Sequence, residues 1–343
     1  MKLICVEEHV LDRSLGQASA ARMGTDAPYA GDWGIRFADT GASTDTNRPR
    51  INAPKVATAK AFDMGQGRID EMNAHGIDMQ VLSYGGMHQW IEGEQAVALI
   101  AAANDRMAAA ARQHPGRFAG FAALPWQDPP AAARELDRAV GELGLKGVLL
   151  SGRPGQHFID APPYAPVLAR LNALRVPLFI HPGMPHPAVQ QAYYGGFDRE
   201  LTARLSLFAW GWHNEAGVHV VRMVLAGLFD RYPDLQVISG HWGELVPFFL
   251  QRLDDSLPRE ATGLSRSISD TYRQHVWVTL SGMCDGPQFE YIRQTIGIER
   301  LLYSVDYPYL SLNGARAWLE ALPISAHDKA LFAHGNAERL FRL

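Results

Sequence analysis

Short apolar runs rich in β-branched residues recur through the chain, and most are separated by segments in which apolar residues repeat with the period of a helix. This alternation predicts a parallel sheet, because parallel strands are joined by crossover connections that usually contain a helix. Eight runs are predicted to form strands: Leu3–Glu8, Ile77–Tyr84, Phe118–Leu124, Lys146–Ser151, Val176–His181, Leu235–Ser239, Val276–Leu280 and Leu301–Val305. Eight such strands close a (β/α)8 TIM barrel, a fold of the α/β class.

Two predicted helices carry signals at their ends. Glu94–Gln113 is rich in alanine and stops before His114-Pro115-Gly116, whereas Pro130–Leu143 begins with proline and stops at Gly144. The other predicted helices are Pro163–Leu174, Glu200–Asp230, Leu245–Asp255, Gln288–Thr295 and Ala315–Leu322. No segment resembles an interdomain linker, so residues 1–343 are predicted to form a single domain.

The longest break in the alternation covers residues 10–62, which are rich in Gly, Pro, Asp, Thr and Ala and separate the first strand from its helix. Insertions of this length in a compact domain are usually functional or mobile, so we predict a cap over the barrel mouth. A second irregular segment, His181–Arg199, carries Tyr193, Tyr194 and Phe197. Its aromatic side chains are predicted to line an apolar pocket.

Composition narrows the classes of partner and metal. The 343 residues are 47% hydrophobic and 20% charged, and the net charge of -4 provides no basic face for nucleic acid or an anionic membrane. The first residues turn acidic before a signal-peptide apolar region develops, and no run of about 18 apolar residues occurs. We therefore expect a cytoplasmic protein that acts on a small molecule. With only Cys5 and Cys284, any metal must be bound by nitrogen and oxygen.

Titratable residues lie at the ends of four predicted strands. Glu7 and His9 are two residues apart, so the pleat of the strand points both side chains to one face. His181, His241 and Asp306 each directly follow or end another apolar strand. The carboxyl ends of barrel strands converge on one mouth, where barrel enzymes place their chemistry. Taken alone, a histidine at a strand end is usually a hydrogen-bonded loop residue, and the alternative for Asp306 is an N-cap or turn former, but the coincidence of these residues predicts a metal site.

Glu7, His9, His181 and Asp306 provide two carboxylates and two imidazoles. This set suits one divalent ion, Zn2+ or Mn2+, and contains too much nitrogen for Ca2+. His241 is predicted to be an acid-base residue, because its charge changes near neutral pH and Glu244 lies one helical turn along. The alternative for Glu244 is a carboxylate that is favoured by the dipole at a helix N-terminus.

Three residues are candidates for substrate contact. Arg252 lies eleven residues after His241, close to three helical turns, so a predicted shared helix face lets it bind a substrate carboxylate. A structural ion pair with Asp254 or Asp255 is the alternative. Trp90 and Arg153 follow the second and fourth strands and are candidates by position alone. His213 and His219 are interpreted as partly buried core. The aromatic cluster Phe208, Trp210 and Trp212 is interpreted as either core or interface.

The motifs of the chain resemble those of the amidohydrolase superfamily, in the branch that includes aminocarboxymuconate-semialdehyde, γ-resorcylate and 5-carboxyvanillate decarboxylases. They are Val6-Glu7-Glu8-His9, Ile180-His181-Pro182, Gly227-Leu228-Phe229-Asp230, Gly240-His241-Trp242-Gly243-Glu244, Tyr303-Ser304-Val305-Asp306-Tyr307-Pro308 and Gly335-Asn336-Ala337-Glu338-Arg339-Leu340-Phe341. The Glu-x-His form of the first motif resembles the benzoate decarboxylase subgroup.

This resemblance implies a metal-dependent decarboxylase of a hydroxylated, dihydroxybenzoate-like aromatic acid. The metal would bind the substrate carboxylate and an ortho phenolic oxygen, and Asp306 would protonate the ring carbon before CO2 leaves. His241 and Glu244 would assist, and Arg252 would help to order the site. A homo-oligomer, a dimer or tetramer, is also implied.

Two other functions use the same residues. One is a hydrolase of an amide, lactone or carbon-carbon bond, in which the metal lowers the pKa of bound water to about 7 and Asp306 or His241 takes the proton. The other is a barrel that binds a small aromatic acid without turnover.

Overall fold

Eight parallel strands form the centre of the computed structural model, which describes residues 1–34 and 47–343. Within these residues the strands are β1 Ile4–Val10, β2 Met79–Tyr84, β3 Phe118–Gly120, β4 Val148–Ser151, β5 Leu178–His181, β6 Val237–Ser239, β7 Val276–Thr279 and β8 Leu301–Leu302. They pair in chain order as a sheet of β1 to β3 and a sheet of β4 to β8.

Backbone hydrogen bonds join the two sheets on both sides. Between β3 and β4, the Ala122 amide donates to the Gly147 carbonyl over 2.8 Å, and between β1 and β8 the Val6 amide donates to the Tyr303 carbonyl over 2.9 Å. These contacts complete the ring of strands. The predicted (β/α)8 barrel is confirmed.

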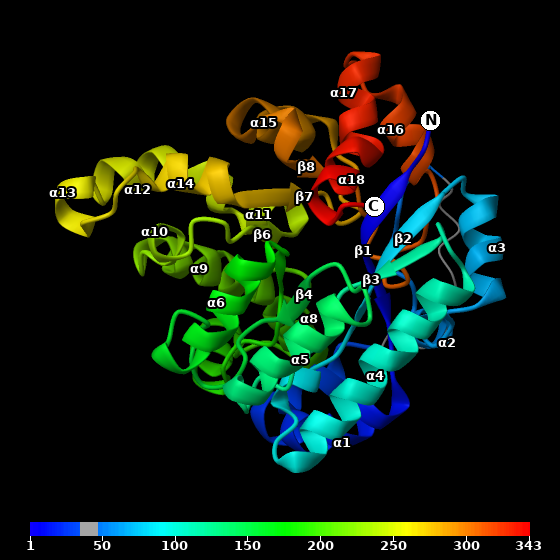
Figure 1. Ribbon diagram of the computed structural model, residues 1–343, viewed down its shortest axis with the longest axis horizontal. Coiled ribbons are helices and arrows are strands. Elements are labelled where there is room, and N and C mark those ends of the chain that lie inside the picture. The colour runs from blue at the N-terminus through cyan, green and yellow to red at the C-terminus, as the bar shows by residue number, and fades with distance from the viewer. Residues whose placement is uncertain (35–46) are drawn as a thin grey trace.

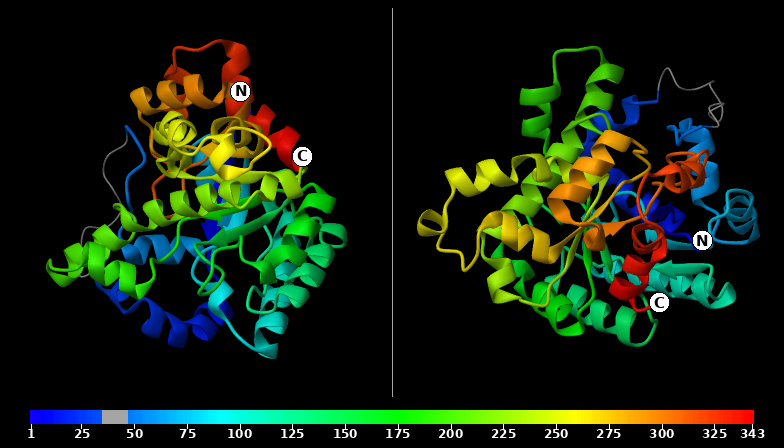
Figure 2. Two further views of the ribbon diagram at one scale, coloured as in Figure 1. Left: turned by 90° about the vertical axis from the view of Figure 1, so that its left-hand side faces the viewer. Right: turned by 90° about the horizontal axis from the view of Figure 1, so that it is seen from above.

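Helices surround the strands and extend beyond them at both ends (Figure 1, Figure 2). The longer ones are α1 Arg13–Asp26, α2 Pro54–Ala61, α3 Gln66–Ala74, α4 Glu94–Gln113, α5 Pro129–Gly141, α6 Ala165–Leu174, α8 Arg199–Ser206, α9 Gly211–Leu225, α12 Leu250–Ser256, α14 Ile268–His275, α15 Gly286–Ile296, α16 Ala315–Ala321 and α18 Asn336–Phe341. None of the helices in the described ranges is long and apolar enough to cross a membrane.

Apolar side chains fill the barrel interior. Val81, Phe121, Phe179 and Trp277 belong to one buried cluster, and Phe341 of α18 packs against Phe121 with their ring centroids 5.5 Å apart. In Figure 1, α18 and both termini lie at the upper end of the barrel, whereas β1 runs down toward α1. The packed interior leaves the lower end, where the strands finish, as the open mouth.

An irregularity in β1 determines which side chains face this mouth. Cys5 pairs with Gln80, but Glu8 already pairs with Leu82, so β1 contains one extra residue between these positions. Val6 belongs to the interior cluster, and Glu7 and His9 nevertheless reach the mouth beyond it. A bulge of this kind redirects side chains and is common beside active sites.

The structure shows helices inside one predicted segment and breaks inside another. The insertion at residues 10–62 contains α1, the 3-10 helix η1 Pro28–Asp32 and α2, with residues 35–46 of the predicted cap lying outside the described part. The predicted helix Glu200–Asp230 is divided into α8, α9 and a short α10, Leu228–Arg231. A Cβ on Gly211 would lie 2.3 Å from the Ser206 carbonyl oxygen, so the break before α9 depends on glycine.

The burial of His219 makes the stability of the folded protein depend on pH. It is fully buried, its Nε2 accepts from the Ile159 amide over 3.2 Å, and burial lowers its pKa to about 3. Since the unfolded chain binds a proton near pH 6.5, the free energy of unfolding falls as pH drops from about 6.5 toward 3. We expect His219→Gln to reduce this slope by about 1 kcal/mol per pH unit in urea titrations. The exposed His157→Gln is the control, and an equal slope in both variants would contradict the assignment.

Candidate functional site

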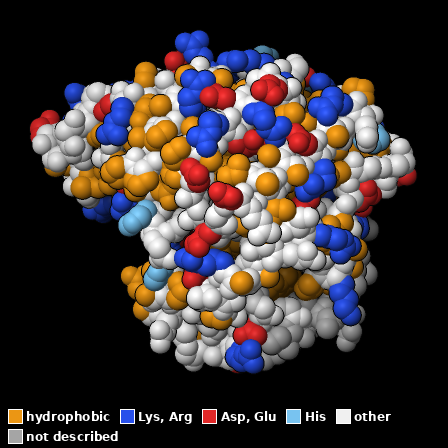
Figure 3. Space-filling model, turned by 60° about the horizontal axis from the view of Figure 1, so that its bottom comes forward, with side chains coloured by type: hydrophobic (Ala, Val, Ile, Leu, Met, Phe, Trp, Pro, Cys, Tyr) orange, Lys and Arg blue, Asp and Glu red, His pale blue; other side chains and the backbone are white. Residues whose placement is uncertain are grey.

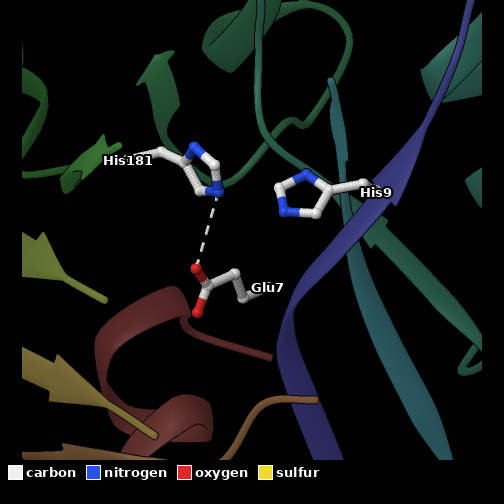
Figure 4. A group of neighbouring side chains, drawn as sticks. All are labelled: Glu7, His9 and His181. Atoms are coloured by element: carbon white, nitrogen blue, oxygen red, sulfur yellow. Dashed lines mark ion pairs between the residues drawn. The ribbon is translucent and has the colours of Figure 1, made fainter. Parts of the chain in front are cut away.

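Four predicted side chains meet at the mouth of the barrel. One ligand atom from each of Glu7, His9 and His181 lies within 4.8 Å of the others, and Figure 4 shows the three side chains pointing toward one another from β1 and β5. His181 Nε2 is 3.7 Å from Glu7 Oε1, and His9 Nε2 is 3.1 Å from Asp306 Oδ1. The structure therefore gathers two imidazoles and two carboxylates in one buried cluster.

One buried atom on each of these four side chains has no hydrogen-bond partner among the described residues. The atoms are Glu7 Oε1, His9 Nε2, His181 Nε2 and Asp306 Oδ1. Leaving one buried polar group unsatisfied costs about 1–3 kcal/mol, and the only close approach among these atoms is the 3.1 Å between His9 Nε2 and Asp306 Oδ1, so the cluster as a whole lacks a compensating partner. A divalent cation fits this donor set, because each atom offers a lone pair and the two carboxylates offset the charge of the ion.

Neighbouring groups fix the orientation of the imidazoles. His9 Nδ1 lies 3.0 Å from Ser83 Oγ, and His181 Nδ1 lies 2.8 Å from the Pro182 carbonyl oxygen. Burial and the neighbouring His9 lower the pKa of His181 to about 3, so this ring is neutral at pH 7. A neutral imidazole that donates from Nδ1 presents its Nε2 lone pair to a metal.

Three hydroxyl groups fix Glu7. Thr279 Oγ1 donates to Glu7 Oε2 over 2.7 Å, Ser304 Oγ donates over 3.2 Å, and Ser281 Oγ donates to the same oxygen. Burial raises the pKa of Glu7 despite these hydrogen bonds and the nearby histidines. Oε2 is thus held by the ends of β7 and β8, and Oε1 is left for a ligand.

We expect Thr279→Val to weaken metal binding by roughly 10–100-fold, the usual cost of losing a group that orients a metal ligand. Valine keeps the shape of threonine but removes the hydroxyl from Glu7. Competition against a fluorescent chelator measures the change in metal affinity. Thr262→Val, whose hydroxyl is exposed, is the control, and equal affinity in both variants would contradict the role of Thr279.

Asp306 is held in place by Glu8, the carboxylate that points away from the mouth. Glu8 Oε1 accepts from the Val305 amide over 2.9 Å and Oε2 accepts from the Tyr307 amide over 3.2 Å, one on each side of Asp306. Asp306 itself has φ of 65°, a conformation that is unfavourable for a residue other than glycine. The buried Arg68, which donates to the His9 carbonyl over 2.6 Å, supports β1 from the same side.

A second cluster adjoins the first and contains His241, Glu244 and His213. His241 Nδ1 is 2.7 Å from Glu244 Oε1, and His213 Nδ1 is 2.9 Å from Glu244 Oε2. His241 Nε2 lies 3.8 Å from Asp306 Oδ2, so the imidazole connects the two clusters.

The charges of this second cluster stabilise one another. Burial opposes charge on both groups, but the His241–Glu244 pairing outweighs it, raising the pKa of His241 and lowering the pKa of Glu244 to about 2. Burial also opposes ionisation of Asp306, yet His241 and His9 hold its pKa below the ordinary range. The arrangement therefore favours a proton on His241 beside an ionised Asp306.

A cavity of about 880 Å³ opens above the two clusters. His9, His181 and Asp306 line one part of it, and the predicted cap contributes Met23, Ala27, Trp33 and Ile51 to its walls. Figure 3 looks toward the lower end of Figure 1 and shows a hollow with hydrophobic side chains inside it. The site can therefore hold an apolar ligand with one end beside the charged groups.

The predicted substrate residues do not line this cavity. Arg252 is exposed on α12, because positive φ values at His241, Trp242, Glu244 and Leu245 interrupt the helix that was predicted to connect it to the site. The continuous helix that periodicity predicted here is interrupted, and the role of Arg252 in substrate binding stays a prediction. Left-handed backbone between the two residues removes the shared face.

Arg153 and Trp90 lie outside the cavity wall. Arg153 donates to Glu215 Oε1 over 2.7 Å, and this ion pair holds its side chain against α9. Trp90 packs against the apolar cluster that contains Tyr29. Tyr193 and Phe197, which were predicted to wall a pocket, are largely exposed, and the loop after β5 contributes its earlier residues to the cavity instead.

Sequence reasoning missed His213 and Trp212. His213 was interpreted as core and Trp212 as core or interface, both within a continuous helix, but the break before α9 places them in the cavity wall. Gly211 inside the predicted helix was the available signal, because an isolated glycine lowers the expectation of an uninterrupted helix.

Comparison with known proteins identifies relatives over most of the chain. A family model described as "Amidohydrolase" matches residues 49–343. Decarboxylase orsB of Emericella nidulans is 34% identical over 289 residues, covering 82% of this chain and 86% of that protein. γ-Resorcylate decarboxylase of Rhodococcus jostii is 34% identical over 303 residues, covering 83% and 89%.

A solved structure gives a further match. It is 5-carboxyvanillate decarboxylase of Novosphingobium aromaticivorans in complex with manganese and 4-hydroxy-3-methoxy-5-nitrobenzoic acid. The TM-score is 0.86 and the sequence identity is 30%, with 100% of this chain and 96% of that chain covered.

Proposed function

Because the chain belongs to the amidohydrolase family, we propose that it is a metal-dependent, non-oxidative decarboxylase of a hydroxylated aromatic acid. One observation carries the proposal: four buried ligand atoms without hydrogen-bond partners in the described chain lie at the end of an apolar, aromatic-lined cavity. An aromatic ring fits the walls, and its carboxylate fits the charged end. The named relatives support this reaction class.

Glu7, His9, His181 and Asp306 are the proposed ligands of one Zn2+ or Mn2+ ion. The donor set suits both metals, and the Novosphingobium structure contains manganese. When bound, the ion supplies a Lewis acid that orients the substrate carboxylate and a neighbouring phenolic oxygen. Elemental analysis of the purified protein is expected to give about one divalent ion per chain.

Asp306 is the proposed proton donor in the chemical step. Its carboxylic proton passes to the ring carbon that bears the substrate carboxylate, with the electron pair drawn from the ring, which the phenolic oxygen makes electron-rich. The bond to the carboxylate then breaks, its electrons restore the aromatic ring, and CO2 leaves. A preorganised charged site stabilises the dearomatised intermediate between these two events.

His241 is the proposed source of the proton that Asp306 transfers. Its Nε2 lies 3.8 Å from Asp306 Oδ2, and Glu244 holds Nδ1 on the opposite side of the ring. His213 in turn fixes the second oxygen of Glu244. The apolar walls exclude water from the intermediate and strengthen these electrostatic interactions.

A panel assay tests the proposed function. Metal-replete enzyme is incubated with mono- and dihydroxybenzoates, and CO2 release and the decarboxylated phenol are measured together, with chelator-treated enzyme as the control. We expect both products from at least one ortho-hydroxylated acid and neither from the control. Turnover of a lactone or amide without CO2 release from any hydroxybenzoate would reject the decarboxylase in favour of metal-assisted hydrolysis.

We further propose that the chain forms a homo-oligomer. Phe248 and Phe249 are about half exposed, with 49% and 58% of their surfaces accessible, and Phe248 stacks on Tyr291 at 4.5 Å between centroids. Adjacent exposed aromatic rings are typical of subunit interfaces. Light scattering coupled to gel filtration is expected to give a dimer or tetramer, and a monomer at micromolar concentration would contradict this.

A further inference from the structure

A row of aromatic rings runs from the metal site toward the predicted cap. The ring centroids of His181 and Trp212 are 6.3 Å apart, those of Trp212 and Phe208 are 6.1 Å apart, and those of Phe208 and Trp33 are 5.2 Å apart. Trp33, Phe208 and Trp212 all line the cavity. The aromatic wall therefore continues well beyond the residues that act on the carboxylate.

This wall has an apolar core of its own, separate from the apolar cluster that fills the barrel interior. Ala27, Tyr29 and Leu207 form the buried centre of this third cluster, and residues of the insertion, the β5 loop and the segment before α9 pack against it. The polar groups here are already engaged, since Tyr29 Oη donates to the Pro185 carbonyl over 2.9 Å and Trp212 Nε1 donates to His213 Nε2 over 3.1 Å. This part of the cavity thus offers apolar surface to a ligand.

The charge of the cavity is confined to the metal end. Among the cavity-lining residues in the described ranges there is no lysine or arginine, whereas Glu244 and Asp306 are acidic. A second anionic group on the substrate would be desolvated in the cavity without forming an ion pair with a lysine or arginine. The remainder of the substrate is therefore expected to be uncharged.

The cavity is also larger than a single hydroxybenzoate ring needs. Its 880 Å³ lies near the upper end of the roughly 300–1,000 Å³ range of pockets that hold drug-sized ligands. Building on the proposed function, we propose that the substrate is a hydroxybenzoic acid with an uncharged alkyl or aryl substituent. The surface formed by Ala27, Trp33, Leu207, Phe208 and Trp212 is its binding subsite, which we term the apolar subsite.

A chain-length series tests the apolar subsite. The probes are 2,4-dihydroxybenzoates that carry hydrogen, methyl, propyl or pentyl at ring position 5 or 6. Dissociation constants come from quenching of tryptophan fluorescence, and kcat/KM comes from CO2 release. In at least one series we expect affinity and kcat/KM to rise by roughly fourfold for each added methylene over the first few carbons.

Different results of this experiment would contradict the apolar subsite and the proposed decarboxylase. Decarboxylation of the unsubstituted acid with flat or falling affinity along both series would overturn the apolar subsite and leave the proposed function intact. Affinity that rises with chain length without CO2 release would support the subsite and reject the decarboxylase.

Two variants and a control variant test whether the apolar subsite binds the substituent of the acid. Phe208→Ala removes part of the wall and is expected to flatten the dependence of affinity on chain length. Gly31→Leu adds bulk at a cavity-lining position where a Cβ meets nothing within 4 Å, and it is expected to weaken binding of the pentyl acid while sparing the unsubstituted acid. Phe197→Ala, at an exposed ring outside the cavity, should retain the wild-type dependence. Equal dependence in all three variants would overturn the assignment.

Discussion

Replacing Asp306 with asparagine is expected to lower kcat for CO2 release by about 10³-fold, while about one divalent ion per chain is retained. A positioned proton donor typically contributes 10²–10⁴-fold to a rate. The asparagine amide oxygen can still approach a metal, but the side chain has no carboxylic proton to give. The substitution therefore separates the two roles that we propose for this residue.

Turnover at saturating substrate and elemental analysis of the same Asp306→Asn preparation measure these two effects. Asp270→Asn is the control, because this exposed carboxylate lies on α14, outside the cavity lining. Loss of metal in parallel with activity would leave Asp306 only a ligand role. Retention of both would contradict the proposed mechanism.

His181→Ala is expected to lose most of its bound metal and at least about 100-fold of its activity. Removing a group that only orients a metal ligand already lowers metal affinity or activity by roughly 10–100-fold, and alanine removes the ligand itself. His181 is buried, with its Nε2 without a hydrogen-bond partner in the described chain, so no neighbouring side chain replaces it. Elemental analysis and the panel assay measure the two losses.

Thermal unfolding with and without chelator provides an independent readout for this variant. At a metal concentration 1,000 times Kd, binding to the folded state stabilises it by about 4 kcal/mol. Chelator should therefore lower the Tm of the unchanged enzyme and of the exposed-site control His327→Ala, but leave His181→Ala almost unaffected. A chelator effect of equal size in all three proteins would exclude His181 as a ligand.

The fold and the clustering of the four candidate ligands could be predicted from the sequence, because both depend on simple periodicities. Helix Glu94–Gln113 has its predicted boundaries, and all eight strands occur where apolar runs predicted them. Barrel topology then brings strand ends together, which is why His181 and Asp306 lie beside Glu7 and His9.

The residues that form the cavity walls could not be predicted from the sequence in the same way. The predicted helix face shared by His241 and Arg252 does not form, because left-handed residues from His241 to Leu245 replace a regular helix, and nothing in the apolar period signals this change. His213 enters the site only because the chain breaks before Gly211. These positions depend on tertiary contacts and local backbone strain, which tend to concentrate at functional sites.

The most direct test of a metal-dependent decarboxylase is product analysis by NMR after turnover of a hydroxybenzoate in D2O. We expect a phenol with one deuterium at the carbon that carried the carboxylate, one CO2 released for each phenol formed, and neither product after chelator treatment. A ring that keeps its carboxylate while an amide or lactone is consumed, or product formation that is unaffected by removing the metal, would contradict this expectation.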